Sequence, residues 1–182
     1  EEIISALFGY GSFDGNSVNN SSLALYYFAL GLPAFALIKV FSSFFFANHN
    51  TKTPFYISLI SVILNVLISI YYFKDVGFII IPIATTISSW FNSMILFIFL
   101  KKEKLFMFTE TFIIKILKII FASILMGLFF YYLTQLFENQ LSYNYQFKSF
   151  YLILSVLLGF VFYLLVSFLI KAFNYKDVQL KY

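Results

Sequence analysis

A single lysine interrupts one of the apolar stretches in the first third of the sequence. Lys39 lies in the otherwise uncharged run from Leu23 to Phe46, and a charged side chain at the centre of a membrane helix costs about 2.5–3.5 kcal/mol on insertion scales. Such residues usually face a protein interior or a water-filled cavity, where the ammonium group would attract an anionic substrate. Alternatively, because Lys39 is about seven residues, or roughly 10 Å, from the end of the run, its side chain extends to the membrane surface.

Two further apolar stretches carry polar residues at helical spacing. Asn65 and Ser69 are four positions apart and therefore share one face of a helix, and Thr85 follows Ile81 by the same interval. The side-chain oxygens of these polar residues, together with the Ile81 carbonyl, could hold a hard cation. Small polar residues also commonly form hydrogen bonds between membrane helices, so both interpretations stay open.

Patterns typical of enzymes are absent from the sequence. There is no cysteine, and His49 stands alone in a polar turn. The acidic residues lie in loops or near the ends of apolar runs, and no two are spaced as a general acid and base. No nucleophile–histidine–acid set, phosphate-binding glycine loop or metal-ligand spacing occurs. The sequence therefore predicts a protein that is not an enzyme, with no catalytic residue and no metal site beyond the cation site described above.

The composition indicates an integral membrane protein. Of the 182 residues, 62% are hydrophobic and 11% are charged, whereas soluble domains carry about 25% charged residues. Five runs approach or exceed the roughly 20 apolar residues that a membrane helix needs: Leu23–Phe46, Phe55–Phe73, Phe78–Leu100, Phe112–Leu133 and Phe150–Phe173. None alternates as barrel strands do, so we predict an all-α membrane protein with five transmembrane helices. The net charge of +4 does not indicate nucleic-acid binding, because the lysines cluster at the ends of the runs.

The lysines also predict the orientation of the helices. All twelve basic residues are lysines, and grouping alternate loops places nine on one side of the membrane and two, Lys74 and Lys148, on the other. Because cytoplasmic loops carry the excess of positive charge, the chain should begin outside and end in the cytoplasm. We expect the end of a preceding helix and an external loop (1–22), a three-helix part (23–100), a cytoplasmic loop (101–111), a peripheral helix pair (112–173) and a cytoplasmic tail (174–182).

Four segments, in this order and spacing, carry a family pattern. They are LFGYGSFD (residues 7–14), LGLPAFALIKVFSSFFFANHNTKTP (30–54), ISLISVILNVLISI (57–70) and KDVGFIIIPIATTISSWFNSMIL (74–96). Together they resemble the MurJ/MviN family of lipid II flippases, within the multidrug/oligosaccharidyl-lipid/polysaccharide exporter superfamily. In that family a lysine occupies the position of Lys39, and Tyr10 stands where a loop arginine is usual.

This resemblance implies that the chain is the C-terminal part, helices ten to fourteen, of a fourteen-helix, two-lobe flippase in the bacterial inner (cytoplasmic) membrane. It implies alternating-access transport of lipid II, an undecaprenyl-pyrophosphate-linked muropeptide, from the inner to the outer leaflet for cell-wall synthesis. The implied partners are lipid II, membrane lipids and the missing N-terminal lobe, with no nucleic acid. The peripheral helix pair would form a groove for the lipid tail.

The resemblance also implies roles for the polar residues described above. Lys39 would line the substrate cavity. Asn65, Ser69, Ile81 and Thr85 would hold a sodium ion, with Ser69 where the family often has aspartate or asparagine. No other cofactor is implied.

Two other functions are compatible with the sequence. One is a different flippase of the same superfamily, carrying another oligosaccharide-lipid or polysaccharide unit, which upstream arginines would distinguish. The other is a membrane scaffold subunit without a transport role. A scaffold needs no polar residues that converge on one face of the first three helices, and Lys39, Asn65 and Thr85 argue against it.

Overall fold

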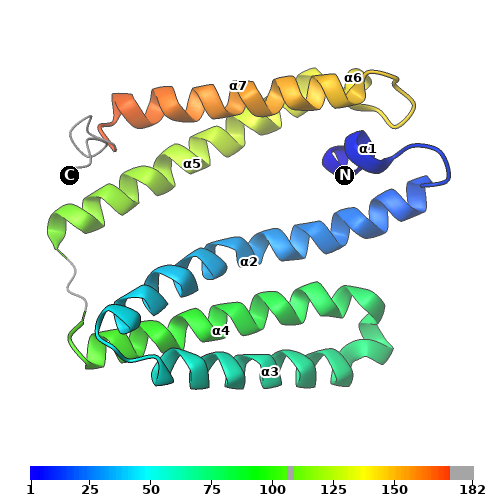
Figure 1. Ribbon diagram of the computed structural model, residues 1–182. Coiled ribbons are helices and arrows are strands. Elements are labelled where there is room, and N and C mark those ends of the chain that lie inside the picture. Colours follow the sequence, from blue (N-terminus) through cyan, green and yellow to red (C-terminus); the bar gives the residue numbers. More distant parts are fainter. Residues whose placement is uncertain (106–108, 173–182) are drawn as a thin grey trace. The chain divides into compact units, whose positions relative to one another are not determined.

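A computed structural model describes residues 1–105 and 109–172 of the chain. Within these ranges the regular secondary structure is entirely helical (Figure 1), which confirms the predicted all-α class. The helices are α1 (Glu2–Phe8), α2 (Gly15–Ala47), α3 (Lys52–Val76), the short 3-10 helix η1 (Gly77–Ile79), α4 (Ile80–Lys102), α5 (Glu110–Leu136), α6 (Glu138–Leu141) and α7 (Lys148–Leu169). The predicted cytoplasmic tail and positions 106–108 of the predicted cytoplasmic loop lie outside the described residues.

Four helical segments are long and apolar enough to cross a membrane. They are Gly15–Ala47, Lys52–Lys102, Glu110–Leu136 and Lys148–Leu169. Between 6% and 22% of the residues in their apolar windows are buried inside the protein, so most of these side chains need lipid to cover them. The chain is therefore a multi-pass membrane protein. The number of five crossings stays a prediction, because the segments found by length and composition number four.

The longest of these segments, Lys52–Lys102 with 51 residues, folds back on itself as a helical hairpin. α3 ends at Val76, and Gly77 follows with φ +71°, a conformation that side chains with a Cβ rarely adopt. After η1 the chain returns as α4, which packs beside α3 (Figure 1). The glycine of the Lys-Asp-Val-Gly turn is thus what allows two apolar helices to be joined by so short a connection.

The described residues form two compact units. Residues 19–105 make a three-helix unit of α2, α3 and α4, and residues 1–18 with 109–172 make a second unit of α1, α5, α6 and α7. At one end of the three-helix unit, Phe45, Ile57, Leu96 and Leu100 are buried against one another. The second unit is held by packing of α5 on α7, where the rings of Phe129 and Phe162 are stacked with centroids 4.3 Å apart.

α2 begins earlier than the sequence indicated. Residues 15–22, which we predicted as part of an external loop, form its first two turns. The backbone N–H of Ser17 donates to Asp14 Oδ1 at 2.8 Å, which satisfies one of the free N–H groups at the start of a helix. Hydrogen bonds from the Ser17 hydroxyl and backbone lower the pKa of the exposed Asp14 carboxyl. Because these polar turns need no apolar surroundings, the helix extends beyond the apolar run.

Backbone carbonyls of α2 accept hydrogen bonds from α4. The Thr86 hydroxyl donates to Tyr27 O at 2.6 Å, and the Trp90 indole N–H donates to Leu30 O at 3.0 Å. Gly31 directly follows Leu30, and a Cβ added to it would lie 3.0 Å from Thr86 Oγ1. Trp90 thus links α2 and α4 through its indole N–H.

Candidate polar site between the helices

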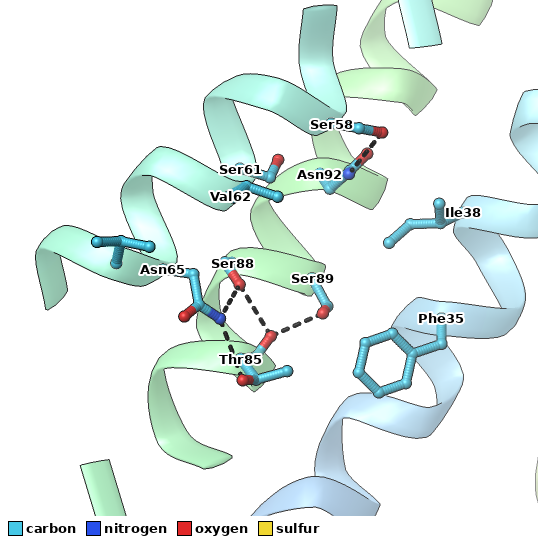
Figure 2. A pocket seen from close by; sticks show the side chains of 11 residues that line it. Phe35, Ile38, Ser58, Ser61, Val62, Asn65, Thr85, Ser88, Ser89 and Asn92 are labelled. Carbon is cyan, nitrogen blue, oxygen red and sulfur yellow. Dashed lines mark hydrogen bonds between the residues drawn. The ribbon is translucent and has the colours of Figure 1, made fainter. Parts of the chain in front are cut away.

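The residues predicted to bind a cation come together in one hydrogen-bond network across the α3–α4 hairpin. The Asn65 amide nitrogen donates to Thr85 Oγ1 at 3.1 Å and to Ser88 Oγ at 3.2 Å (Figure 2). The Thr85 hydroxyl donates to Ile81 O at 2.8 Å, and the Ser69 hydroxyl approaches Asn65 Oδ1 at 3.5 Å. Spacing along each helix therefore identified residues that the hairpin brings within hydrogen-bonding distance.

The direction of these hydrogen bonds determines how well the network suits a sodium ion. The Thr85 hydroxyl hydrogen is directed to Ile81 O, and that of Ser88 to Thr85 O at 3.0 Å. Both oxygens are left as acceptors, which orients the Asn65 amide with its nitrogen toward them and its oxygen toward Ser69. In this arrangement the NH2 group, and not the oxygen, faces Thr85. The residues thus fit an interhelical hydrogen-bond network, and sodium binding stays a prediction that requires the amide to rotate.

Next to this network lies a groove of about 400 Å³ between α2, α3 and α4, which we call the polar groove. Besides Asn65 and Thr85, its polar lining is supplied by Ser58, Ser61, Ser88, Ser89 and Asn92. Figure 2 shows Phe35 and Ile38 of α2 on the side opposite these polar residues. Asn92 and the serines were not among the predicted site residues, because their convergence depends on how α3 and α4 pair.

In the second unit, a buried lysine is enclosed by the loop that follows α1. Lys148 is 1% exposed, and its ammonium group donates to Gly9 O at 2.7 Å and to Tyr143 O at 2.8 Å. The ammonium nitrogen also lies 4.3 Å from the ring centroid of Tyr10 and 4.6 Å from that of Tyr143, within the range of cation–π attraction. The hydroxyl groups of Tyr10 and Ser149 lie 2.8 Å apart. From the sequence alone, Lys148 bears only on the predicted orientation of the helices, because its partner Gly9 lies 139 residues away.

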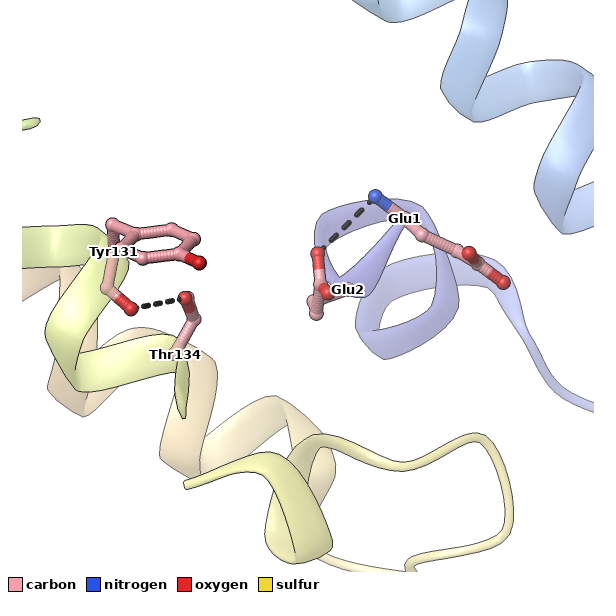
Figure 3. Close-up of polar contacts among 4 residues, drawn as sticks. All are labelled: Glu1, Glu2, Tyr131 and Thr134. Carbon is pink, nitrogen blue, oxygen red and sulfur yellow. Dashed lines mark hydrogen bonds and ion pairs between the residues drawn. The ribbon is translucent and has the colours of Figure 1, made fainter. Parts of the chain in front are cut away.

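A smaller pocket of about 260 Å³ in the same unit has an acidic lining. Its lining includes Glu1, Glu2, Ser5, Thr134 and Glu138. Figure 3 shows Glu2 bound to the amino group of Glu1, at 3.2 Å, and the Thr134 hydroxyl donating to Tyr131 O, at 2.8 Å. No group of histidine, cysteine, aspartate or glutamate side chains in the described part of the chain is placed to hold a metal ion, so we assign this pocket no ligand.

Comparison with known proteins identifies the family. A family model described as "Lipid II flippase MurJ" matches residues 1–152. The chain belongs to the MurJ lipid II flippase family. The family is one of transporters, and the resemblance predicted from the four sequence segments is confirmed.

Individual members of the MurJ family match along nearly the whole chain. A protein named "Probable lipid II flippase MurJ" from Rickettsia prowazekii is 29% identical over 180 residues, which cover 96% of this chain and 35% of that protein. Proteins of the same name from Thermotoga maritima and Rhizobium tropici are each 30% identical, over 98% and 93% of this chain and 34% and 32% of their own lengths. The chain thus spans about a third of the length of these MurJ relatives.

Lys39, the lysine that interrupts the first apolar run, lies on α2 and is not itself among the residues that line the polar groove. Its side chain is exposed, and among the described residues it has no hydrogen-bonding or ionic partner. It follows Ile38 directly and Phe35 by four positions, and both of these residues line the groove. Its predicted role in a substrate cavity, and the alternative of reaching the membrane surface, both stay predictions.

Proposed function

We propose that this chain is part of a flippase that moves lipid II, the undecaprenyl-pyrophosphate-linked peptidoglycan precursor, from the inner to the outer leaflet of the bacterial cytoplasmic membrane. The observation that carries this proposal is the match of residues 1–152 to the MurJ family model. The apolar helices support it, since a lipid-linked substrate has to be moved within the membrane. The protein acts as a transporter and not as an enzyme.

Transport would proceed by alternating access, in which two lobes move about a central site. This chain would supply part of the second lobe, and the remaining two-thirds of the protein would supply the first lobe and most of the cationic groups. The chain would begin outside and end in the cytoplasm. The α5–α7 pair, whose side chains are largely exposed and apolar, would provide the surface along which the lipid tail lies.

Lys39 would add positive potential toward the pyrophosphate. At an effective dielectric constant of about 20, two unit charges attract by about 4 kcal/mol at 4 Å and by about 1.7 kcal/mol at 10 Å. Cavity water screens part of this attraction. Since 1.4 kcal/mol corresponds to a tenfold change in affinity, loss of the Lys39 charge should weaken transport by about tenfold without abolishing it.

The proposal is tested by expressing the full-length protein in bacteria depleted of their own lipid II flippase. We expect restored growth and restored exposure of lipid II on the outer leaflet. The Lys39→Met variant should insert normally and transport about tenfold more slowly, whereas Lys39→Arg should retain most activity because a distant point charge does not depend on side-chain shape. Lys74→Met, in the last turn of α3, is the matched control. Cells that remain unable to expose lipid II with the full-length protein would contradict the proposed function.

A further inference from the structure

The connection from α6 to α7 (Figure 1) has its charge inside and its aromatic rings outside. Lys148 is 1% exposed, whereas Phe147 and Phe150 are 61% and 63% exposed. Lys148 is also the only charged residue in the sequence between positions 139 and 170. A loop surrounded by water normally exposes its lysine and shields its phenylalanines. The reversed arrangement therefore indicates surroundings that are less polar than water.

Further rings extend this exposed surface to the loop that follows α1. Tyr145 lies next to Phe147, with ring centroids 6.5 Å apart. The rings of Tyr10 and Tyr143 contact the buried Lys148 ammonium group on one side, and these two tyrosines are 49% and 40% exposed. The buried lysine thus holds rings from two loops side by side at the surface. We call this set the aromatic surface: Tyr10, Tyr143, Tyr145, Phe147 and Phe150.

The aromatic surface continues an exposed apolar stripe of α7. Phe150, Ile153 and Leu157 follow Phe147 at intervals of three or four residues, a spacing that places them on one face of a helix. Ile153 and Leu157 are each 56% exposed. Because only 22% of the residues in the apolar window of α7 are buried inside the protein, this stripe needs lipid to cover it. At Phe147, directly before α7, the stripe passes into the loop without a break.

We propose that the aromatic surface lies in the headgroup region of the membrane and fixes the depth of this end of the α5–α7 pair at the lipid surface. Aromatic side chains are favoured where hydrocarbon meets water, because they combine an apolar ring with, in tyrosine, a polar tip. Phe147 and Phe150 would contact the acyl chains, and the Tyr145 hydroxyl would reach the headgroups. The proposal does not depend on which substrate the protein transports or on which side of the membrane this end lies.

The partner is a phospholipid surface that need not be anionic. Binding through negative charge requires an exposed cation, and the lysine of this connection is buried beneath the rings. An acidic peptide would lack a cationic partner for the same reason. Phospholipids with a net uncharged headgroup should therefore be sufficient to bind the aromatic surface.

Spin-label accessibility in the full-length protein tests which medium surrounds the aromatic surface. The Phe147→Cys variant carries a nitroxide label in an otherwise cysteine-free full-length protein, placed in nanodiscs of phosphatidylcholine. Asn139→Cys, at an exposed polar position on α6, is the matched control. We expect the label at position 147 to collide more often with oxygen, which concentrates in lipid, than with a water-soluble nickel chelate. The label at position 139 should show the reverse, and a label on Tyr145→Cys should give an intermediate ratio.

Three results would overturn the proposal. Collisions at position 147 mainly with the nickel chelate would show that the loop projects into water. Rare collisions with both reagents would show that protein covers the aromatic surface. Equal ratios at positions 147 and 139 would show that the rings select no particular depth. None of these measurements involves transport, so the proposal can hold even if the proposed function fails.

Discussion

Replacing Lys148 with methionine removes the charge that holds the loop after α1 against the start of α7 while it preserves most of the side-chain volume. Gly9 O and Tyr143 O would each lose a donor at 2.7 and 2.8 Å. The rings of Tyr10 and Tyr143 would lose their cation. We expect the loop of residues 9–14 to open more often, with little effect on the helices beyond it.

The size of the effect follows from these contacts. A hydrogen bond to a charged group contributes about 1.5–3 kcal/mol, so the two bonds of Lys148 contribute about 3–6 kcal/mol before other terms. Burying an ammonium group costs several kcal/mol, and the methionine variant avoids that cost. The free energy that keeps the loop closed should therefore fall by about 1–3 kcal/mol, near the cost of leaving buried acceptors unpaired. A loss of this size increases the population of the open loop about 5- to 150-fold.

Hydrogen–deuterium exchange of the full-length protein in lipid nanodiscs measures this opening directly. The amides of Gly9 and Phe13, which donate to Ser5 O and Tyr10 O at 3.0 and 3.2 Å, report on the loop. Exchange in the Lys148→Met variant should accelerate at these amides and stay unchanged in α3 and α4. Unchanged exchange in this loop would refute the reasoning. Equal acceleration throughout the protein would show that the lysine supports the whole fold.

A matched control separates loss of the contacts from loss of a lysine in general. Lys118 lies on α5 in the same unit and makes no hydrogen bond or ion pair to another described residue. Lys118→Met should therefore leave exchange at the loop unchanged. A second variant, Tyr10→Leu, removes one aromatic ring and the contact with Ser149 but keeps both carbonyl hydrogen bonds, and it should accelerate exchange less than Lys148→Met.

Three further predictions follow from individual contacts. Gly31→Ala should be less stable than Gly127→Ala by about 1–3 kcal/mol in thermal unfolding, because the new Cβ at Gly31 lies 3.0 Å from Thr86 Oγ1. Gly127→Ala, inside α5 and with nothing within 4 Å of the new Cβ, should itself stabilise the helix by about 0.5–1 kcal/mol. Because the pKa of Asp14 is lowered in the folded protein, its contact with Ser17 stabilises the start of α2 above the unfolded-state pKa, and this stabilisation is lost as the pH falls through the folded-state pKa. Hydrogen–deuterium exchange at the start of α2 should therefore accelerate as the pH falls through these two pKa values. The Asp14→Asn variant should lack this pH dependence. For topology mapping, cysteines introduced at Ser17 and Asn139 should react with a reagent added from outside, whereas cysteines at His49 and Lys104 should not. External labelling at position 104 would contradict the predicted orientation.

Several features of this protein were predictable from the sequence because they depend on local spacing and composition. The low charge and the long apolar runs indicate membrane helices regardless of how the helices pack. The spacing of Asn65 and Ser69 places them on one face of α3 because the helix repeats every 3.6 residues. The four family segments lie within single helices and the turns that join them, so they could be recognised without any knowledge of the packing.

Other features depend on which helix faces meet, which helical periodicity does not encode. Lys148 lies 139 residues from Gly9, and its burial follows from the fold of the loop after α1. Trp90 donates to a carbonyl of α2 because these helices approach each other closely at Gly31. The orientation of the Asn65 amide is set by hydroxyl groups on another helix. Periodicity determines which residues share a face, whereas tertiary packing determines which partners that face meets and hence the direction of each hydrogen bond.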